Sequence, residues 1–137
     1  MNLSIYCLTL GGMASLFVAV LHVILAIKPQ GYRTFGGGEL AELAKRGSPF
    51  VVLVTVGLAL MFAIWGAYGF SGAGMIGPLP LLQAVLIAIG VLYMLGSAML
   101  ASEFVKSLGS GSALRFAAFS AGALTFGLLH LVGALTR

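Results

Sequence analysis

The distribution of charge along the chain constrains its fold more than any other feature. The chain has seven Lys or Arg and three Asp or Glu residues, and none of them lies in residues 1–27, 47–102 or 116–136. The hydrocarbon core of a bilayer is about 30 Å thick, and about 20 apolar helical residues cross it. The first and last stretches are long enough for one crossing each, and the middle stretch is long enough for two. The sequence therefore predicts an all-α integral membrane protein with four transmembrane helices in an antiparallel bundle.

The composition agrees with a membrane protein and narrows the classes of function. Hydrophobic residues make up 61% of the chain and charged residues 7%, whereas soluble domains average about 45–50% and 25%. The formal net charge of +4 does not indicate a nucleic-acid partner, because the basic residues flank apolar stretches, where positive charge orients a membrane protein. The expected partner is the lipid bilayer. A chain of 137 residues has room for a single membrane domain.

Helix-breaking residues predict where each crossing ends. Lys28-Pro29 ends the first, Ser48-Pro49 opens the second, and the Gly- and Pro-rich residues 70–80 separate the second from the third. The expected spans are about 3–27, 49–69, 79–102 and 113–135. They are joined by a loop over 28–48, an outer hairpin loop over 70–78 and a turn over 103–112. The N-terminal stretch has no basic region ahead of it, so we expect a retained span and not a cleaved signal peptide.

The basic residues predict the orientation. Six of the seven lie on the side of the first and third connections, and Arg137 lies on the opposite side. Because positive charge accumulates in cytoplasmic loops, we expect a cell (inner) membrane protein with both connections in the cytoplasm and both termini outside. Four of these residues are also candidates to bind anionic lipid headgroups: Lys28, Arg33, Lys45 and Arg46.

Residues 38–46 have the periodicity of a short amphipathic helix. One side would carry Leu40, Ala41, Leu43 and Ala44, and the other Glu39, Glu42, Lys45 and Arg46. Glu42 and Arg46 are four residues apart with the acid first, which is a favourable helical pair. We expect an interfacial helix between the first two spans; a solvated connector is the alternative.

Each expected span carries a row of small residues at intervals of four. The rows are Gly11, Ser15 and Ala19; Ala59, Ala63 and Ala67; Ala84 and Ala88; and Ala113, Ala117 and Ala121. Membrane helices associate through close packing of small residues and through a few polar contacts. These rows predict a tightly packed bundle.

His22 and His130 are the strongest candidates for chemistry, because ionisable groups within a span are rare and usually face the bundle interior. Residues at matching depth suggest two buried polar clusters. The cytoplasmic half would hold His22, Thr55, Ser97 and Ser120, and the outer half His130, Thr9, Trp65 and Gln83. The first interpretation is that both histidines are interhelical hydrogen-bonded ties. The alternative is that they are steps of a proton or solute path, since histidine titrates near neutral pH.

No cofactor, metal site or catalytic residue is expected. Two intramembrane histidines suggest haem ligation, but each lies about six residues beyond the centre of its span, toward opposite leaflets, which separates them by about 18 Å. No carboxylate pair, zinc motif or serine–histidine–acid set can be assembled from three acids. The lone Cys7 excludes an internal disulfide, and it has no neighbouring cation that would activate it.

These features favour a small polytopic inner-membrane protein that acts non-catalytically by helix packing. It would work as a homo-oligomer or as an accessory subunit of a membrane complex, so self-association or another membrane protein is the expected partner. Two alternatives stay open: a component of a small-solute or proton transporter or channel, and a haem- or quinone-binding membrane redox protein.

Overall fold

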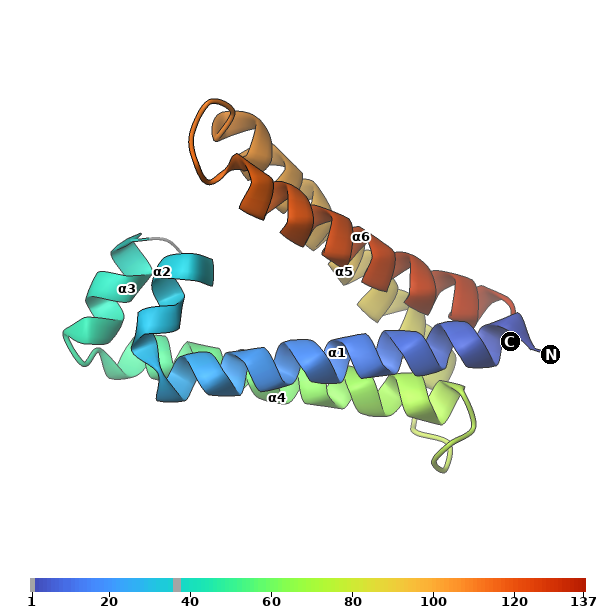
Figure 1. The fold of residues 1–137 in the computed structure, drawn as a ribbon. Helices are drawn as coiled ribbons and strands as arrows, with labels where there is room; N and C mark the ends of the chain where they lie inside the picture. The colour runs from blue at the N-terminus through green and yellow to red at the C-terminus, as the bar shows by residue number, and fades with distance from the viewer. Residues whose placement is uncertain (1, 36–37) are drawn as a thin grey trace. The chain divides into compact units, whose positions relative to one another are not determined.

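The computed structural model describes residues 2–35 and 38–137 and is built from helices. Their order is α1 (Leu3–Ile27), a 3-10 turn η1 (Pro29–Gly31), α2 (Tyr32–Phe35), α3 (Gly38–Lys45), α4 (Pro49–Gly72), α5 (Leu82–Lys106) and α6 (Ala113–Leu135) (Figure 1). The helices α1, α4, α5 and α6 are each long and apolar enough to cross a membrane. The predicted fold class is therefore confirmed, with a short helix between the first two spans.

The chain divides into two compact units, and α1 and α4 contribute to both of them. The terminal unit consists of Met1–Ala14 and Ala67–Arg137, and the central unit consists of Ser15–Gly66. The terminal unit contains α5 and α6, and the central unit contains η1, α2 and α3.

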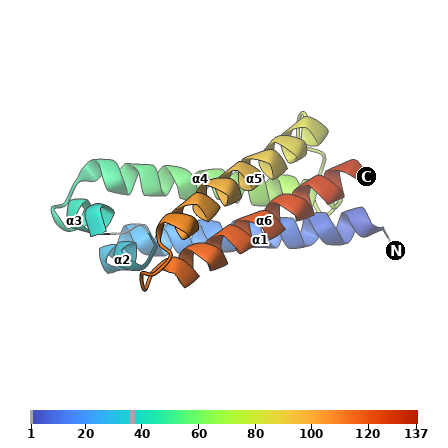
Figure 2. The same cartoon turned by 90° about the horizontal axis from the view of Figure 1, so that it is seen from above.

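In the terminal unit, α5 and α6 lie side by side along their lengths and form an antiparallel hairpin (Figures 1 and 2). Glycines allow their backbones to approach. A Cβ atom on Gly90 would lie 2.5 Å from Leu131 Cγ and 3.1 Å from the carbonyl oxygen of Gly127. A Cβ atom on Gly127 would lie 3.0 Å from the carbonyl oxygen of Gly90. This crossing therefore has no room for a larger residue at either position.

A second close approach joins the ends of α1 and α4 that belong to the terminal unit. A Cβ atom on Gly69 would lie 2.7 Å from Gly12 Cα and 2.9 Å from the carbonyl oxygen of Leu8. Leu8 is completely buried. It forms the centre of an apolar core whose other members are Ala73, Leu82, Leu86 and Ala134.

The small-residue rows predict the contact face of α1 but not those of α5 and α6. In α1, Gly11, Ser15 and Ala19 are all buried. In α5, Ala84 and Ala88 are exposed, and in α6 the row reaches exposed Ala121. Ala113 and Ala117 of the α6 row are half-buried, and the closest approach between α5 and α6 is made by Gly90 and Gly127. Small residues at intervals of four are common on any membrane helix, so spacing alone does not identify the packed face.

The connection between α4 and α5 lies further along the chain than the expected 70–78. The helix α4 continues to Gly72, and α5 begins at Leu82. Ser71, in the last turn of α4, donates a hydrogen bond to the carbonyl oxygen of Gly77 (2.9 Å) and accepts one from the N–H of Leu79 (3.0 Å). Leu81, which precedes α5, has a left-handed backbone with φ 53°. Ser71 thus folds the loop back onto α4, and α5 starts after both prolines.

The central unit packs α3 onto the end of α1 and the beginning of α4. Its apolar core consists of Leu25, Tyr32, Ala41, Ala44 and Val51. Leu43, which the periodicity places on the same side as the two alanines, is 45% exposed. Glu42 pairs with Lys45 (3.3 Å), three residues away, and not with Arg46 as the spacing suggested. The side chains of Glu39 and Leu40 lie outside the part of the chain that the structure describes.

Candidate functional site: buried polar groups of the membrane helices

His130 of α6 is the most completely buried polar side chain of the terminal unit, with an exposed fraction of 0%. Its Nδ1 lies 2.9 Å from the carbonyl oxygen of Phe126, one turn earlier in the same helix. The ring lies against Gly11 of α1, where a Cβ atom would come within 2.8 Å of Cε1. The Tyr93 ring of α5 lies 5.7 Å away, centroid to centroid, with an interplanar angle of 30°. Three helices therefore enclose this imidazole.

The hydrogen bond to Phe126 assigns the tautomer of His130. A carbonyl oxygen only accepts, so Nδ1 carries the proton and Nε2 presents its lone pair. Nε2 is buried and has no hydrogen-bond partner among the described residues. A buried polar atom left unpaired costs about 1–3 kcal/mol. The terminal unit therefore contains a desolvated imidazole acceptor without a partner among the described residues.

His22 of α1 makes the same local bond in a different environment. Its Nδ1 lies 2.8 Å from the carbonyl oxygen of Val18, again four residues earlier. The ring is only partly buried and lies 5.1 Å from the Phe62 ring of α4. Phe62 in turn meets Trp65 edge to face, with centroids 5.1 Å apart. Both histidines thus bond by Nδ1 to their own helix and not, as expected, across the bundle, because a carbonyl one turn back is within reach of a ring nitrogen.

The structure brings together Ser97 and Ser120, two members of the expected cytoplasmic-half cluster. Ser97 Oγ donates to the carbonyl oxygen of Ser120 (2.9 Å), and Ser120 Oγ donates to the carbonyl oxygen of Ser97 (3.0 Å). Their hydroxyl oxygens lie 3.2 Å apart. This reciprocal pair ties α5 to α6 within the terminal unit.

Thr55, a third member of that cluster, has other partners in the central unit. Its hydroxyl donates to the carbonyl oxygen of Val51 (2.8 Å) and lies 2.5 Å from the hydroxyl of Tyr32. Because the Thr55 proton is used on Val51, Tyr32 donates to Thr55. This buried bond fastens α2 to α4. Sequence reasoning missed Tyr32 because its place just outside a span suggested no buried partner.

The residues expected in the outer half also bond to different partners. Gln83 Nε2 donates to the carbonyl oxygen of Ala134 (2.5 Å), and the Thr9 hydroxyl lies 3.7 Å from Met75 sulfur. Trp65 belongs to the central unit and packs on Phe62. Ser4, which the sequence did not single out, is buried and donates to the carbonyl oxygen of Gly133 (2.8 Å). Within the terminal unit, the bonds of Gln83 and Ser4 join α5 and α1 to the C-terminal turn of α6, whereas Thr9 contacts the loop after α4.

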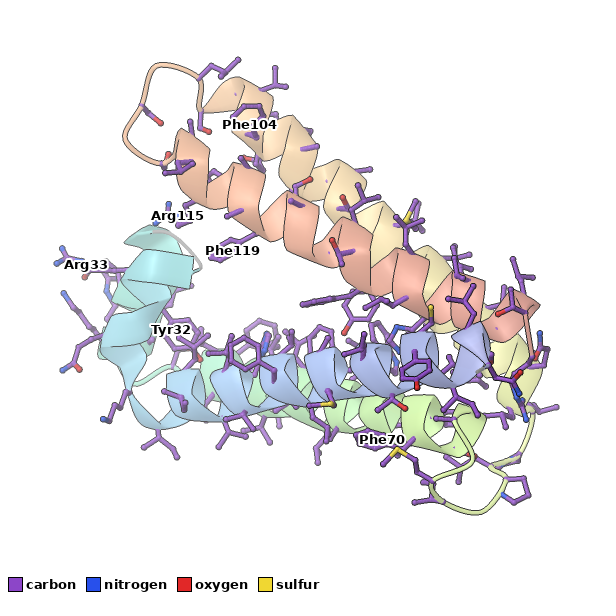
Figure 3. All side chains as sticks on the ribbon, turned by 45° about the vertical axis from the view of Figure 1, so that its right-hand side comes forward. Tyr32, Arg33, Phe70, Phe104, Arg115 and Phe119 are labelled. Atoms are coloured by element: carbon purple, nitrogen blue, oxygen red, sulfur yellow. The ribbon has the colours of Figure 1, made fainter. Side chains whose placement is uncertain are left out.

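The basic residues proposed to meet lipid headgroups are all exposed: Lys28, Arg33, Lys45 and Arg46. They belong to the central unit, near its connection from α1 to α4. Figure 3 shows Arg33 with its nitrogen atoms directed away from the helix that carries it. This part of the surface is therefore positively charged.

The described residues contain no group of three His, Cys, Asp or Glu side chains that could hold a metal ion. Glu42 and Glu103 are at the surface, paired with Lys45 at 3.3 Å and Lys106 at 2.6 Å. Cys7 is a free, buried thiol. The arrangement therefore consists chemically of interhelical hydrogen bonds and the buried imidazole of His130. Comparisons of the chain with protein-family models, curated proteins and solved structures find no match.

Proposed function

We propose that this small multi-pass membrane protein acts non-catalytically by helix packing, as the subunit of a homo-oligomer or as an accessory subunit of a membrane complex. The observation that carries the proposal is how little of each span the chain itself covers. In the most apolar window of each span, only 22–28% of the residues are buried. The remaining faces carry large exposed apolar side chains such as Phe17, Leu60 and Leu95. Such faces suit lipid or the helices of other subunits.

The polar groups of the spans support the same proposal. Ser97, Ser120, Thr55 and Gln83 bond to residues on another helix of their own unit. Bonds of this kind join helices and add stability of about 0.6 kcal/mol each on average. Polar atoms used in this way serve structure and not chemistry.

We also propose on which side of the membrane the connections and the chain ends lie. The surplus of Lys and Arg at the connections after α1 and α5 favours a cell (inner) membrane, with these connections in the cytoplasm and both chain ends outside. Lys45, in the connection after α1, and Lys106, at the end of α5, are both exposed.

The test is to determine the composition of the complex that is extracted from the membrane. The protein is extracted from its native membrane in polymer-bounded lipid discs and analysed by native mass spectrometry. We expect a discrete assembly, either several copies of the chain or the chain with another membrane protein in fixed proportion. A population of single chains with lipid alone contradicts the proposal.

A second candidate function is a step in a proton or solute path, and one observation favours it. The unpartnered Nε2 of His130 is a fully desolvated acceptor, and an imidazole nitrogen with a free lone pair can accept a proton. The test is proton flux into liposomes loaded with a pH-sensitive dye. Under this candidate, His130→Ala abolishes flux that the unmodified protein supports, whereas His22→Ala retains it. Equal flux through all three proteins and empty liposomes contradicts it.

A further inference from the structure

The junction of α3 and α4 places positive charge directly beside an apolar surface. Lys45 ends α3, Arg46 follows it, and α4 begins at Pro49. Gly47, with φ 71°, turns the chain, and the N–H of Ser48 donates to the carbonyl oxygen of Leu43 (3.1 Å). Three peptide bonds separate Arg46 from Pro49, so their Cα atoms lie within about 11 Å of each other.

The net charge of the connection between α1 and α4 is positive, whichever of its side chains form ion pairs. Residues 28–48 contain four cations and two carboxylates. One of the carboxylates, Glu42, already pairs with Lys45 at 3.3 Å. The excess charge therefore attracts an anion, and Lys45 and Arg46 are both exposed to it.

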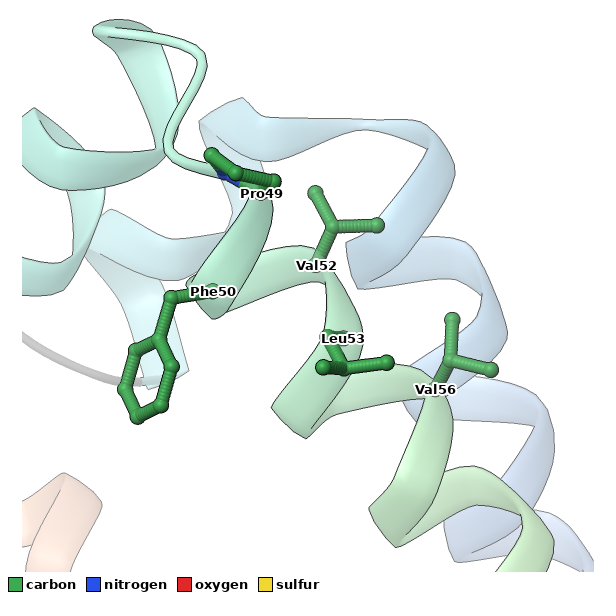
Figure 4. Close-up of a pocket in the computed structure, with 5 residues that line it drawn as sticks. All are labelled: Pro49, Phe50, Val52, Leu53 and Val56. Atoms are coloured by element: carbon green, nitrogen blue, oxygen red, sulfur yellow. The ribbon is translucent and has the colours of Figure 1, made fainter.

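The first two turns of α4 form a shallow pocket lined by hydrocarbon side chains: Pro49, Phe50, Val52, Leu53 and Val56 (Figure 4). Phe50 and Leu53 are each 70% exposed. Because α4 is one of the membrane-spanning helices, its first turns lie where headgroups meet acyl chains. The pocket therefore presents apolar surface at the depth of the upper acyl chain.

The charged and apolar parts are held together by the packing of the central unit. Ala41 and Ala44 of α3 are buried against Val51 of α4, and Tyr32 donates to Thr55 of α4 (2.5 Å). These contacts hold the first turn of α4, with Phe50, beside the end of α3, which Arg46 follows. A ligand with a charged head and an apolar tail can contact both without rearranging the protein.

We propose that this surface, the α3–α4 lipid site, binds a phospholipid with an anionic headgroup. Lys45 and Arg46 contact the headgroup, and Phe50 and Leu53 contact an acyl chain. An acidic peptide would satisfy the charge but not the apolar pocket, and a neutral lipid would satisfy the pocket but not the charge. A basic residue near an anionic membrane surface strengthens binding by about fivefold.

The first experiment measures which lipid lies beside Phe50. The chain has one tryptophan, so Phe50→Trp combined with Trp65→Phe moves the fluorophore to the site. The protein is placed in liposomes of phosphatidylcholine and phosphatidylglycerol, with bromine atoms on the upper acyl chain of one lipid or the other. We expect stronger quenching when phosphatidylglycerol is brominated, at equal mole fraction of the two lipids. Equal quenching by the two lipids overturns the proposal.

Variants of the basic residues show which side chains cause the preference for phosphatidylglycerol. Arg46→Gln, which leaves the Glu42–Lys45 pair in place, should reduce the preference for phosphatidylglycerol several-fold, and Lys45→Gln with Arg46→Gln should remove it. Lys106→Gln is the matched control, because Lys106 is an exposed cation paired with Glu103 (2.6 Å) outside the central unit. It should retain the preference. A double variant that retains the full preference overturns the proposal.

A second measurement needs no change at Trp65, which packs on Phe62. The unmodified chain is released from detergent micelles that contain equal amounts of phosphatidylcholine and phosphatidylglycerol, and native mass spectrometry counts the lipids that remain bound. We expect phosphatidylglycerol to be retained about fivefold or more over phosphatidylcholine, and excess inorganic phosphate not to displace it, because phosphate has no acyl chain. Equal retention, or displacement by phosphate, overturns the proposal.

Discussion

His130 of the terminal unit and His22 of the central unit have closely similar local sequences and different environments. Each follows a leucine and precedes an alanine by four residues, and each bonds by Nδ1 to the carbonyl oxygen of the preceding turn. His130 is completely buried between Gly11 and Tyr93, whereas His22 is partly exposed beside Phe62. The regular geometry of a helix explains the hydrogen bond that both histidines make. The residues on the neighbouring helices explain why the two side chains differ in burial.

The glycines of the two units show the same contrast. Gly69 of the terminal unit meets the backbone of Gly12, while Gly57 of the central unit has nothing within 4 Å of the position of a Cβ atom. Both glycines belong to α4. The helix α4 is therefore in close backbone contact with α1 at Gly69, whereas the chain does not fill the space beside Gly57.

The largest effect should come from Gly69→Ala. Its Cβ atom would lie 2.7 Å from Gly12 Cα, and backbone atoms cannot move aside as a flexible side chain can, so we expect a loss of about 1–3 kcal/mol. Unfolding in mixed micelles by a denaturing detergent measures it. Gly57→Ala is the matched control and should cause no loss. Equal destabilisation by both variants contradicts the close approach.

His130→Ala should destabilise more than His22→Ala. Removing the buried ring leaves a cavity that costs about 2–3 kcal/mol, less the relief of deleting an unpaired acceptor. His22 is partly exposed, so its loss should cost about 1 kcal/mol or less. The same unfolding assay compares the two variants. A reversed order would show that His130 is not the enclosed member of the pair.

The hydrogen bonds that tie each unit should have intermediate effects. Tyr32→Phe removes the donor to Thr55 and should lower the free energy of unfolding by about 0.5–1.5 kcal/mol in the same unfolding assay.

In the terminal unit, a double-mutant cycle of Ser97→Ala and Ser120→Ala should give a coupling energy of about 0.6 kcal/mol and at most about 1.7. A coupling near zero means that the two serines do not act as a pair.

The smallest effect should come from the surface ion pairs. Lys45 and Glu42 are both exposed, with side-chain exposures of 49% and 55%, so water screens their attraction. Glu42→Gln should change the stability by no more than about 0.5 kcal/mol. The unfolding assay at low and high salt checks this. A loss comparable to that of His130→Ala would contradict the assignment of this pair to the solvated surface.

The number of spans and the short helix after α1 could be predicted from sequence, because both follow from local properties. Charge-free stretches indicate how many times the chain can cross, and Lys28-Pro29 and Ser48-Pro49 mark helix ends. The Ser97–Ser120 pair could also be predicted, because depth along the membrane normal follows from residue number. All of these inferences use position along a helix and nothing about its rotation.

Apart from the face of α1 that carries the row of small residues, the packed faces could not be predicted, because they depend on helix rotation. A helix that is apolar all round has no hydrophobic stripe to show which side meets its neighbours. Gly69, Gly90 and Gly127 are therefore indistinguishable in sequence from Gly57. The Tyr32–Thr55 bond was missed for a related reason, since it depends on how α2 folds back onto α4.

Site-directed labelling tests the central claim, four crossings of a bilayer, most directly. Cys7→Ser removes the natural thiol, and single cysteines are introduced as Asn2→Cys, Ser110→Cys or Thr136→Cys. A membrane-impermeant maleimide is applied to intact cells and to inverted vesicles. The account predicts that residues 2 and 136 react from the outside and residue 110 from the cytoplasmic side. Labelling of residues 2 and 136 from opposite sides would contradict it, because it would require an odd number of crossings.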